Sequence, residues 1–216
     1  MIRRSPSLLL LISLVVLLLV TPQAEGRAFS AYVVTLLFAL VLFSALRATA
    51  GSGWHRVLAT GLGVLWLCLS VWNTTAANRS AELGSQLVFM SFASFIITLL
   101  IRRIVSADRV DFEVVCASPS VYLLIAIIWA VSYNVIESLV PGSFATTKGD
   151  PQIDLAGFLY FSLTTITTLG YGDITPVSRG ARSLATLEAV VGQLYVAIFV
   201  ARLVGLYLTT SRRSDD

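Results

Sequence analysis

Charge is scarce in this sequence. Of its 216 residues 12% are Asp, Glu, Lys or Arg and 56% are hydrophobic. A soluble domain carries about twice that charged fraction, so a soluble globular protein is excluded. The net charge of +3 does not indicate a nucleic-acid partner, because the arginines cluster at the ends of apolar runs. We therefore expect a multi-pass membrane protein whose surroundings are the lipid bilayer.

Residues that commonly carry chemistry are also few. The two cysteines, Cys68 and Cys116, fall in no metal-binding or redox spacing. The lone histidine, His55, lies in a loop, where a solvated side chain is a better explanation than a pH sensor. No nucleophile with a base, metal-ligand cluster or phosphate-binding loop is visible. The sequence predicts neither an enzyme nor a cofactor.

Arginines are missing from the segment where a voltage sensor would carry them. A sensor helix places arginine at every third position, and residues 83–100 contain none. We expect little or no intrinsic voltage dependence. What opens the protein, and which regulators it binds, cannot be read from the sequence.

Long apolar runs are abundant. They predict an all-α membrane protein with six transmembrane helices and a re-entrant helix between the fifth and the sixth. The runs cover residues 8–20, 29–46, 57–72, 83–101, 121–140 and 181–208. The corresponding regions are a short first helix or signal peptide (1–25), further membrane helices (26–104), a cytoplasmic linker (105–120), a pore domain (121–210) and a cytoplasmic tail (211–216). For residues 1–25 a retained short helix is favoured over a cleaved signal.

The loops alternate in positive charge. Arginines are concentrated between the second and third runs, between the fourth and fifth runs, and after the last run, whereas Arg27 lies in a poorer loop. The positive-inside rule puts the richer loops in the cytoplasm. Both termini, including Arg213, are then cytoplasmic if the first helix is retained. A cell (inner) membrane is the expected location.

One stretch, Thr164–Pro176 (TTITTLGYGDITP), lies between the last two long runs. A cation is dehydrated inside a bilayer by closely spaced backbone carbonyl oxygens, and alternate residues must reach left-handed backbone angles to present them. Gly170 and Gly172 adopt such angles almost without cost. Asp154 is suited to N-cap a short helix at residues 155–167 that leads into this loop.

These residues resemble the selectivity filter of the potassium-channel superfamily, and the chain resembles its bacterial two-helix pore family with four additional N-terminal helices. The resemblance implies K⁺ coordination by carbonyls of Thr168, Leu169, Gly170 and Tyr171, followed by Gly172, with the Thr168 hydroxyl as the innermost ligand. Leucine stands where valine is usual. K⁺ is then the permeant ion rather than a cofactor.

The resemblance also implies residues that support the filter. Tyr160 and Phe161 match an aromatic pair that braces it, and Tyr160 stands where tryptophan is common but can still donate to Asp173. Thr164 occupies a position where some bacterial channels carry a glutamate paired with that aspartate. Filter stability here is therefore expected to depend on different hydrogen bonds.

In the last helix Gly192 matches a gating hinge, with a close helix contact as the alternative. Gln193, Val196, Val200 and Val204 share one helical face, which we assign to a wet cavity and an apolar gate. Two ionisable residues lie roughly on the opposite face. Arg202 is expected to meet Asp111 or Glu113. Glu188 is either a protonated carboxyl hydrogen-bonded behind the pore helix or a pH sensor.

The function implied is passive, potassium-selective transport of ions through a homotetramer, because each chain contributes one loop to a closed ring. Two alternatives remain open. One is a poorly selective cation channel with the same fold. The other is a non-conducting membrane regulatory subunit.

Overall fold

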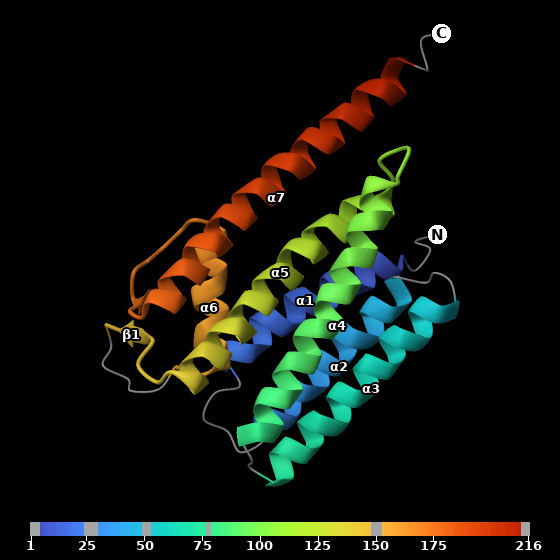
Figure 1. Ribbon diagram of the computed structural model, residues 1–216. Helices are drawn as coiled ribbons and strands as arrows, with labels where there is room; N and C mark the ends of the chain where they lie inside the picture. Colours follow the sequence, from blue (N-terminus) through green and yellow to red (C-terminus); the bar gives the residue numbers. More distant parts are fainter. Residues whose placement is uncertain (1–4, 24–29, 49–52, 77–78, 148–152, 213–216) are drawn as a thin grey trace.

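The computed structural model describes residues 5–23, 30–48, 53–76, 79–147 and 153–212, so Arg27 and Arg213 lie outside the described residues. Helices make up most of this part of the chain (Figure 1). The elements in order are α1 (Pro6–Val20), the 3-10 helix η1 (Thr21–Gln23), α2 (Ser30–Ala48), α3 (Gly53–Ala76), α4 (Arg79–Val105), α5 (Phe112–Leu139), β1 (Phe144–Thr146), α6 (Leu155–Ile166), β2 (Ile174–Pro176) and α7 (Arg179–Arg212).

The all-α membrane class is confirmed, but the count of six spans is not. Within the described residues four helices, α3, α4, α5 and α7, are long and apolar enough to cross a membrane. The apolar part of α2 is shorter, and α1 has 15 residues. At 1.5 Å per residue α1 rises about 22 Å, less than the hydrocarbon core of about 30 Å.

The helices form two groups that share α5. On one side α1, α2, α3 and α4 pack into a bundle with α5, and on the other side α6 and α7 lie against it (Figure 1). Leu10, Leu14 and Leu17 are fully buried and recur on one face of α1, which explains how this short helix joins the core. Whether it is kept in the mature protein stays a prediction.

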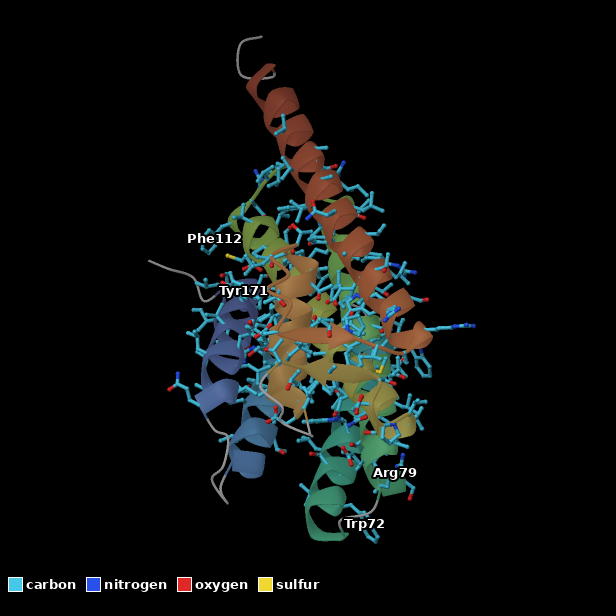
Figure 2. All side chains as sticks on the ribbon, turned by 90° about the vertical axis from the view of Figure 1, so that its left-hand side faces the viewer. Trp72, Arg79, Phe112 and Tyr171 are labelled. Carbon is cyan, nitrogen blue, oxygen red and sulfur yellow. The ribbon has the colours of Figure 1, made fainter. Side chains whose placement is uncertain are left out.

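Successive helices reverse direction. Trp72 and Arg79, near the junction of α3 and α4, lie at one end of the molecule, and Phe112 at the start of α5 lies toward the other (Figure 2). We call the end that carries β1 and β2 the hairpin end and the end that carries residues 106–111 the linker end. Arginines at the two ends of α4 connect it to α5. Arg79 donates a hydrogen bond to the Ser138 carbonyl, and the Arg103 guanidinium lies 3.5 Å from the Glu113 carboxylate.

The helix that contains the fifth predicted span begins before that span. The span was predicted to begin at residue 121, after Pro119, with residues 105–120 as a cytoplasmic linker, and α5 begins at Phe112 and contains Pro119, so helical structure extends into the predicted linker. Asp111 caps the helix by accepting from the Val114 amide at 2.8 Å. Pro119 follows the first two turns, and a proline inside a helix can be accommodated when its neighbours supply compensating contacts.

A two-stranded antiparallel pair, which was not predicted from the sequence, brackets the segment that contains the predicted filter residues. Ala145 of β1 faces Thr175 of β2. The Thr147 amide donates to the Asp173 carbonyl at 2.9 Å, and the Val177 amide donates to the Ser143 carbonyl at 2.8 Å. These hydrogen bonds connect the residues that follow the loop to the segment that follows α5.

Candidate functional site

The loop after α6 has the backbone that its sequence requires. Gly170 and Gly172 have positive φ angles of 54° and 78°, and Thr168 has a φ of 60°, the one such value for a non-glycine residue in the described part of the chain. Three alternate residues therefore reach the left-handed region. A residue with a Cβ adopts it at a cost of roughly 1–2 kcal/mol, so Thr168 is held there by its surroundings.

Those surroundings are the end of α6. The amides of Leu169 and Gly170 both donate to the Thr164 carbonyl, at 2.8 and 3.0 Å, and the Thr168 amide donates to the Thr165 carbonyl at 2.9 Å. Within the described residues no hydrogen-bond donor reaches the carbonyls of residues 168–172. These oxygens are therefore available as acceptors for another group.

The hydroxyl of Thr168 is compatible with the same use. It donates to the Thr167 carbonyl at 2.6 Å. A hydroxyl oxygen that donates one hydrogen bond still has lone pairs that can coordinate a cation. Its role as an innermost ligand stays a prediction.

Tyr160 and Tyr171 form the aromatic contact beside the loop. Their rings are nearly parallel, with centroids 6.3 Å apart, and the Tyr160 hydroxyl donates to Asp173 at 2.8 Å. The hydrogen bond to Asp173 raises the pKa of Tyr160, so the donor keeps its proton. Asp173 also accepts from the Ile174 amide at 3.1 Å. Both ends of the Gly-Tyr-Gly segment are thus fixed by hydrogen bonds.

Phe161 lies elsewhere. It is buried among Tyr133, Phe144 and Phe158, with ring centroids 5.1 Å from Tyr133 and 5.5 Å from Phe144. It therefore joins α6 to α5 and β1, and any support that it gives to the filter is indirect. The Thr164 hydroxyl donates within its own helix to the Phe161 carbonyl, so the backbone of Thr164 rather than its side chain contacts the loop.

The loop is exposed in the single chain. Leu169 is 55% exposed and Tyr171 is 67% exposed, which is unusual for large apolar side chains beside a buried helix. The face predicted to line the pore is also uncovered, since Gln193 is exposed and Val196, Val200 and Val204 are 42–52% exposed. These groups lie on the side of α7 that its own chain leaves free.

Gly192 is a point of close contact. A Cβ at this position would lie 2.5 Å from the Ile166 Cγ1 atom and 2.7 Å from the Ile166 carbonyl oxygen. Only glycine lets α7 approach the end of α6 so closely. The alternative of a close helix contact is therefore present in the structure, and the hinge role stays a prediction. The same Ile166 carbonyl accepts from the Tyr122 hydroxyl of α5 at 2.9 Å.

Glu188 of α7 is fully buried and contacts both α5 and α6. One carboxyl oxygen contacts the Tyr133 hydroxyl of α5, and the other lies 2.5 Å from the Ser162 hydroxyl of α6. Ser162 is also 2.7 Å from the Ala126 carbonyl. Three hydrogen bonds need three protons, and the two hydroxyl groups supply two. The third is supplied if Glu188 is protonated and donates to Ser162, which matches the first of the two expectations for this residue.

The predicted partner of Arg202 is wrong. Its guanidinium donates to the Val105 and Ala107 carbonyls, at 2.5 and 3.0 Å, and not to Asp111 or Glu113. Val105 is the last residue of α4 and Ala107 lies just after it. Carbonyls at the end of a helix have no partner within it and carry the negative end of its dipole, so they attract a cation. Asp111 caps α5, and Glu113 faces Arg103.

Sequence reasoning missed three residues that position the site. Glu137 accepts from the amides of Gly142 and Phe144, at 2.7 and 3.1 Å, and so orders the turn that leads into β1. The Tyr195 hydroxyl of α7 donates to the Ser118 carbonyl of α5 at 2.7 Å. Tyr122, already described, joins α5 to α6. An ionisable or hydroxyl-bearing side chain inside an apolar run is the signal that identifies such residues.

Comparisons with known proteins identify relatives of part of this chain. Residues 120–208 match the family described as ion channel. The chain is 35% identical over 69 residues to the two pore potassium channel c of Oryza sativa subsp. japonica, and 35% identical over 81 residues to the inward rectifier potassium channel Kirbac3.1 of Paramagnetospirillum magnetotacticum. The matches cover 32% and 36% of this chain but 15% and 24% of those two proteins.

A third relative, protein LctB of Bacillus caldotenax, is 28% identical over 106 residues, which is 47% of this chain and 78% of LctB. No solved structure matches the chain significantly. The residues that match the ion channel family, 120–208, include most of α5, all of α6 and the loop, and most of α7.

Proposed function

We propose that this chain, whose residues 120–208 form an ion channel domain of the potassium-channel superfamily, is one subunit of a potassium-selective channel that conducts K⁺ passively through a homotetrameric pore. The observation that carries the proposal is the backbone of the loop at residues 168–172. Positive φ angles alternate along it, and within the described residues its carbonyls have no donor. Stacked carbonyl oxygens can replace the hydration shell of K⁺.

A single loop surrounds an ion on one side only. The exposed Leu169 and Tyr171 and the uncovered face of α7 support a ring of copies around a common axis. A closed symmetric ring of identical chains repeats one contact and leaves no edge. Four loops, one from each chain, is the arrangement that the filter sequence implies.

Below the loop the same ring has a cavity and a gate. The C-terminal end of α6, at Ile166 and Thr167, directs the negative end of its dipole toward the cavity, which favours a waiting cation. Gln193 contributes a polar group there. Val196, Val200 and Val204 form an apolar constriction that closes by dewetting, and Gly192 permits the bend or the contact on which opening depends.

The expected setting is the cell (inner) membrane, with the loop on the outer side and both chain ends in the cytoplasm. The uneven distribution of arginine between loops supports this orientation. We expect no enzymatic activity at this site, because its backbone carbonyls and apolar side chains provide neither a nucleophile nor a general base.

Ion flux from liposomes tests the proposal. Purified protein is reconstituted, and K⁺ efflux is compared with Na⁺ efflux for the wild-type chain and for Gly170→Asp. Gly180→Asp is the matched control, because a Cβ there meets nothing within 4 Å and an acid is favoured in the first turn of α7.

The expected result is K⁺ efflux well above Na⁺ efflux, abolished by Gly170→Asp and retained in Gly180→Asp. Equal Na⁺ efflux would favour the poorly selective channel. Absence of flux, persisting after Val200→Asn is introduced to hold the apolar gate wet, would favour the non-conducting regulatory subunit.

A further inference from the structure

The half of α7 that follows Gly192 has little cover from its own chain. Val196, Val200 and Val204 are 42–52% exposed, and 17% of the apolar span of α7 is buried inside the chain. A segment with so little apolar burial is held in place by a small number of specific contacts. Those contacts therefore determine where the predicted gate lies.

Polar side chains of α7 make such contacts in this half. The Tyr195 hydroxyl donates to the Ser118 carbonyl of α5 at 2.7 Å. About two turns further on, the Arg202 guanidinium donates to the carbonyls of Val105 and Ala107 at 2.5 and 3.0 Å. Because Val105 ends α4, the second contact connects α7 to the N-terminal helices and not only to the pore segment.

Arg202 lies on the side of α7 that faces away from the predicted pore-lining residues. At 3.6 residues per turn it is about 160° around the helix from Val200 and Val204. Burial agrees with this placement, because the Arg202 Nε atom is buried and the neighbouring Phe199 and Leu203 pack against the core. A contact on this side draws α7 toward its own bundle and away from the axis of a ring of copies.

The contact is sensitive to any movement of α7 about Gly192. Arg202 follows Gly192 by ten residues, which is about 15 Å along the helix. A bend of about 20° at Gly192 would therefore move Arg202 sideways by roughly 5 Å. Hydrogen bonds do not tolerate such a displacement, so the contact and a bend of this size exclude each other.

The chemistry of the contact allows it to be released. The guanidinium is charged, which strengthens its hydrogen bonds, but both acceptors are uncharged backbone carbonyls. Its Nε atom is buried and has no hydrogen-bond partner, which costs free energy. Arg202 therefore holds α7 in place without the strength of a fully paired ion pair.

We propose that Arg202 is a positioning residue of the gate: by binding the end of α4 it holds this half of α7 away from the pore axis and keeps the constriction at Val200 and Val204 wide. When the contact is released, α7 moves toward the axis and the valines of the copies close the path by dewetting. Movement of α4 reaches the gate through the same contact. The effect on conduction rests on the function proposed above, whereas the effect on the position of α7 does not.

Ion flux from liposomes tests the consequence for the gate. K⁺ efflux is measured for the wild-type chain, for Arg202→Met, which keeps a long side chain without donors, and for Arg202→Lys, which keeps a charged donor. Arg109→Met is the matched control, because Arg109 is exposed in the linker that follows α4. The double variant Val200→Asn/Arg202→Met is compared with Val200→Asn alone. Circular dichroism spectra equal to that of the wild type establish that the variants are folded.

We expect Arg202→Met to lower K⁺ efflux by about tenfold, because the loss of a charge-assisted hydrogen bond changes an equilibrium by about that much. Arg202→Lys should retain most of the efflux, and Arg109→Met all of it. The double variant should conduct as well as Val200→Asn alone, because a wetted constriction no longer depends on the position of α7. Unchanged efflux in Arg202→Met, or a loss that Val200→Asn does not restore, would overturn the role in the gate.

The distance between two spin labels tests the contact without conduction. The labels are attached at Trp54→Cys and Gly205→Cys in a chain whose free cysteines, Cys68 and Cys116, are replaced by alanine. Trp54 is 73% exposed and a Cβ at Gly205 meets nothing within 4 Å, so both positions accept a label. Labelled chains are diluted with unlabelled chains so that distances within one chain are measured.

We expect a narrow distance distribution in the wild type and in Arg202→Lys, and longer distances in Arg202→Met. An unchanged distribution in Arg202→Met would overturn the proposal, whatever the flux. Longer distances with unchanged K⁺ flux would contradict the role in the gate. If neither the wild type nor Val200→Asn conducts K⁺, the proposed channel function fails, and the distances still decide whether Arg202 positions α7.

Discussion

The helices α5 and α7 both contact α6 but differ in how much of each is covered. Of the apolar span of α5, 61% is buried inside the chain, whereas the corresponding value for α7 is 17%. The chain therefore supplies the surroundings of α5 by itself. The surroundings of α7 must come from lipid, water or other copies. Both helices nevertheless make side-chain contacts with α6: Tyr122 of α5 donates to the Ile166 carbonyl, and Glu188 of α7 is hydrogen-bonded to Ser162.

Glu188 provides the strongest test of that shared contact. Replacement by alanine would leave the Tyr133 and Ser162 hydroxyls without their partner and open a void, and we expect a loss of about 3–5 kcal/mol in the free energy of unfolding. Titration with sodium dodecyl sulfate, followed by circular dichroism, measures it.

Glu188→Gln is the matched control for that prediction. If Glu188 is protonated, as the count of hydrogen-bond donors indicates, an amide can donate to Ser162 and accept from Tyr133, and stability should stay within about 1 kcal/mol of the wild type. A loss as large as that of Glu188→Ala would contradict the protonated state.

The difference between the two helices is tested by placing the same residue in each. Val131 of α5 is 4% exposed and Val200 of α7 is 51% exposed. Val131→Asn buries an unpaired amide and should destabilise the protein by roughly 2–3 kcal/mol. Val200→Asn should change stability by less than about 0.5 kcal/mol and increase K⁺ leak from liposomes, because it wets the apolar constriction. Equal destabilisation by both substitutions would contradict the conclusion that α5 is covered by its own chain and α7 is not.

Gly192→Ala tests the contact between α7 and the end of α6. The added methyl group would overlap Ile166, so we expect a loss of about 1–3 kcal/mol in detergent unfolding. Gly205→Ala, in the same helix but with nothing within 4 Å, should instead stabilise α7 by about 0.5–1 kcal/mol. If the two alanines behave alike, the contact with α6 does not restrict α7.

Tyr160→Phe is expected to have the smallest effect on folding, because the side chain lies near the surface and the ring can still stack on Tyr171. Only the hydrogen bond to Asp173 is lost. We expect an unchanged unfolding midpoint and a faster decline of K⁺ flux with time, as the loop loses one of its supports. A sustained flux identical to that of the wild type would show that Asp173 is held sufficiently by the Ile174 amide.

The pore segment was largely predictable because its constraints are local. The N-cap at Asp154 and the left-handed angles at Gly170 and Gly172 are confirmed, since capping and glycine conformation depend on a few neighbouring residues. The ligand and gate roles of residues 168–172 and of the α7 face stay predictions.

What could not be predicted concerns contacts between segments far apart in the chain. The two turns of α5 that precede the fifth apolar run were not predicted either, because Pro119 follows them. Arg202 was paired with an acid by charge alone, although the end of α4 offers carbonyls at the right place. Phe161 was expected to brace the filter, and its ring contacts are with the aromatic side chains of α5 and β1, Tyr133 and Phe144.

The sequence by itself determined that this chain is a helical membrane protein and where its loop bends, because hydropathy and glycine conformation are properties of short stretches. Tertiary structure alone decided which groups meet inside it: Glu188 with Tyr133 and Ser162, Arg202 with the Val105 and Ala107 carbonyls, and Gly192 with Ile166. Buried polar groups must find partners wherever packing brings them, and packing depends on every helix at once.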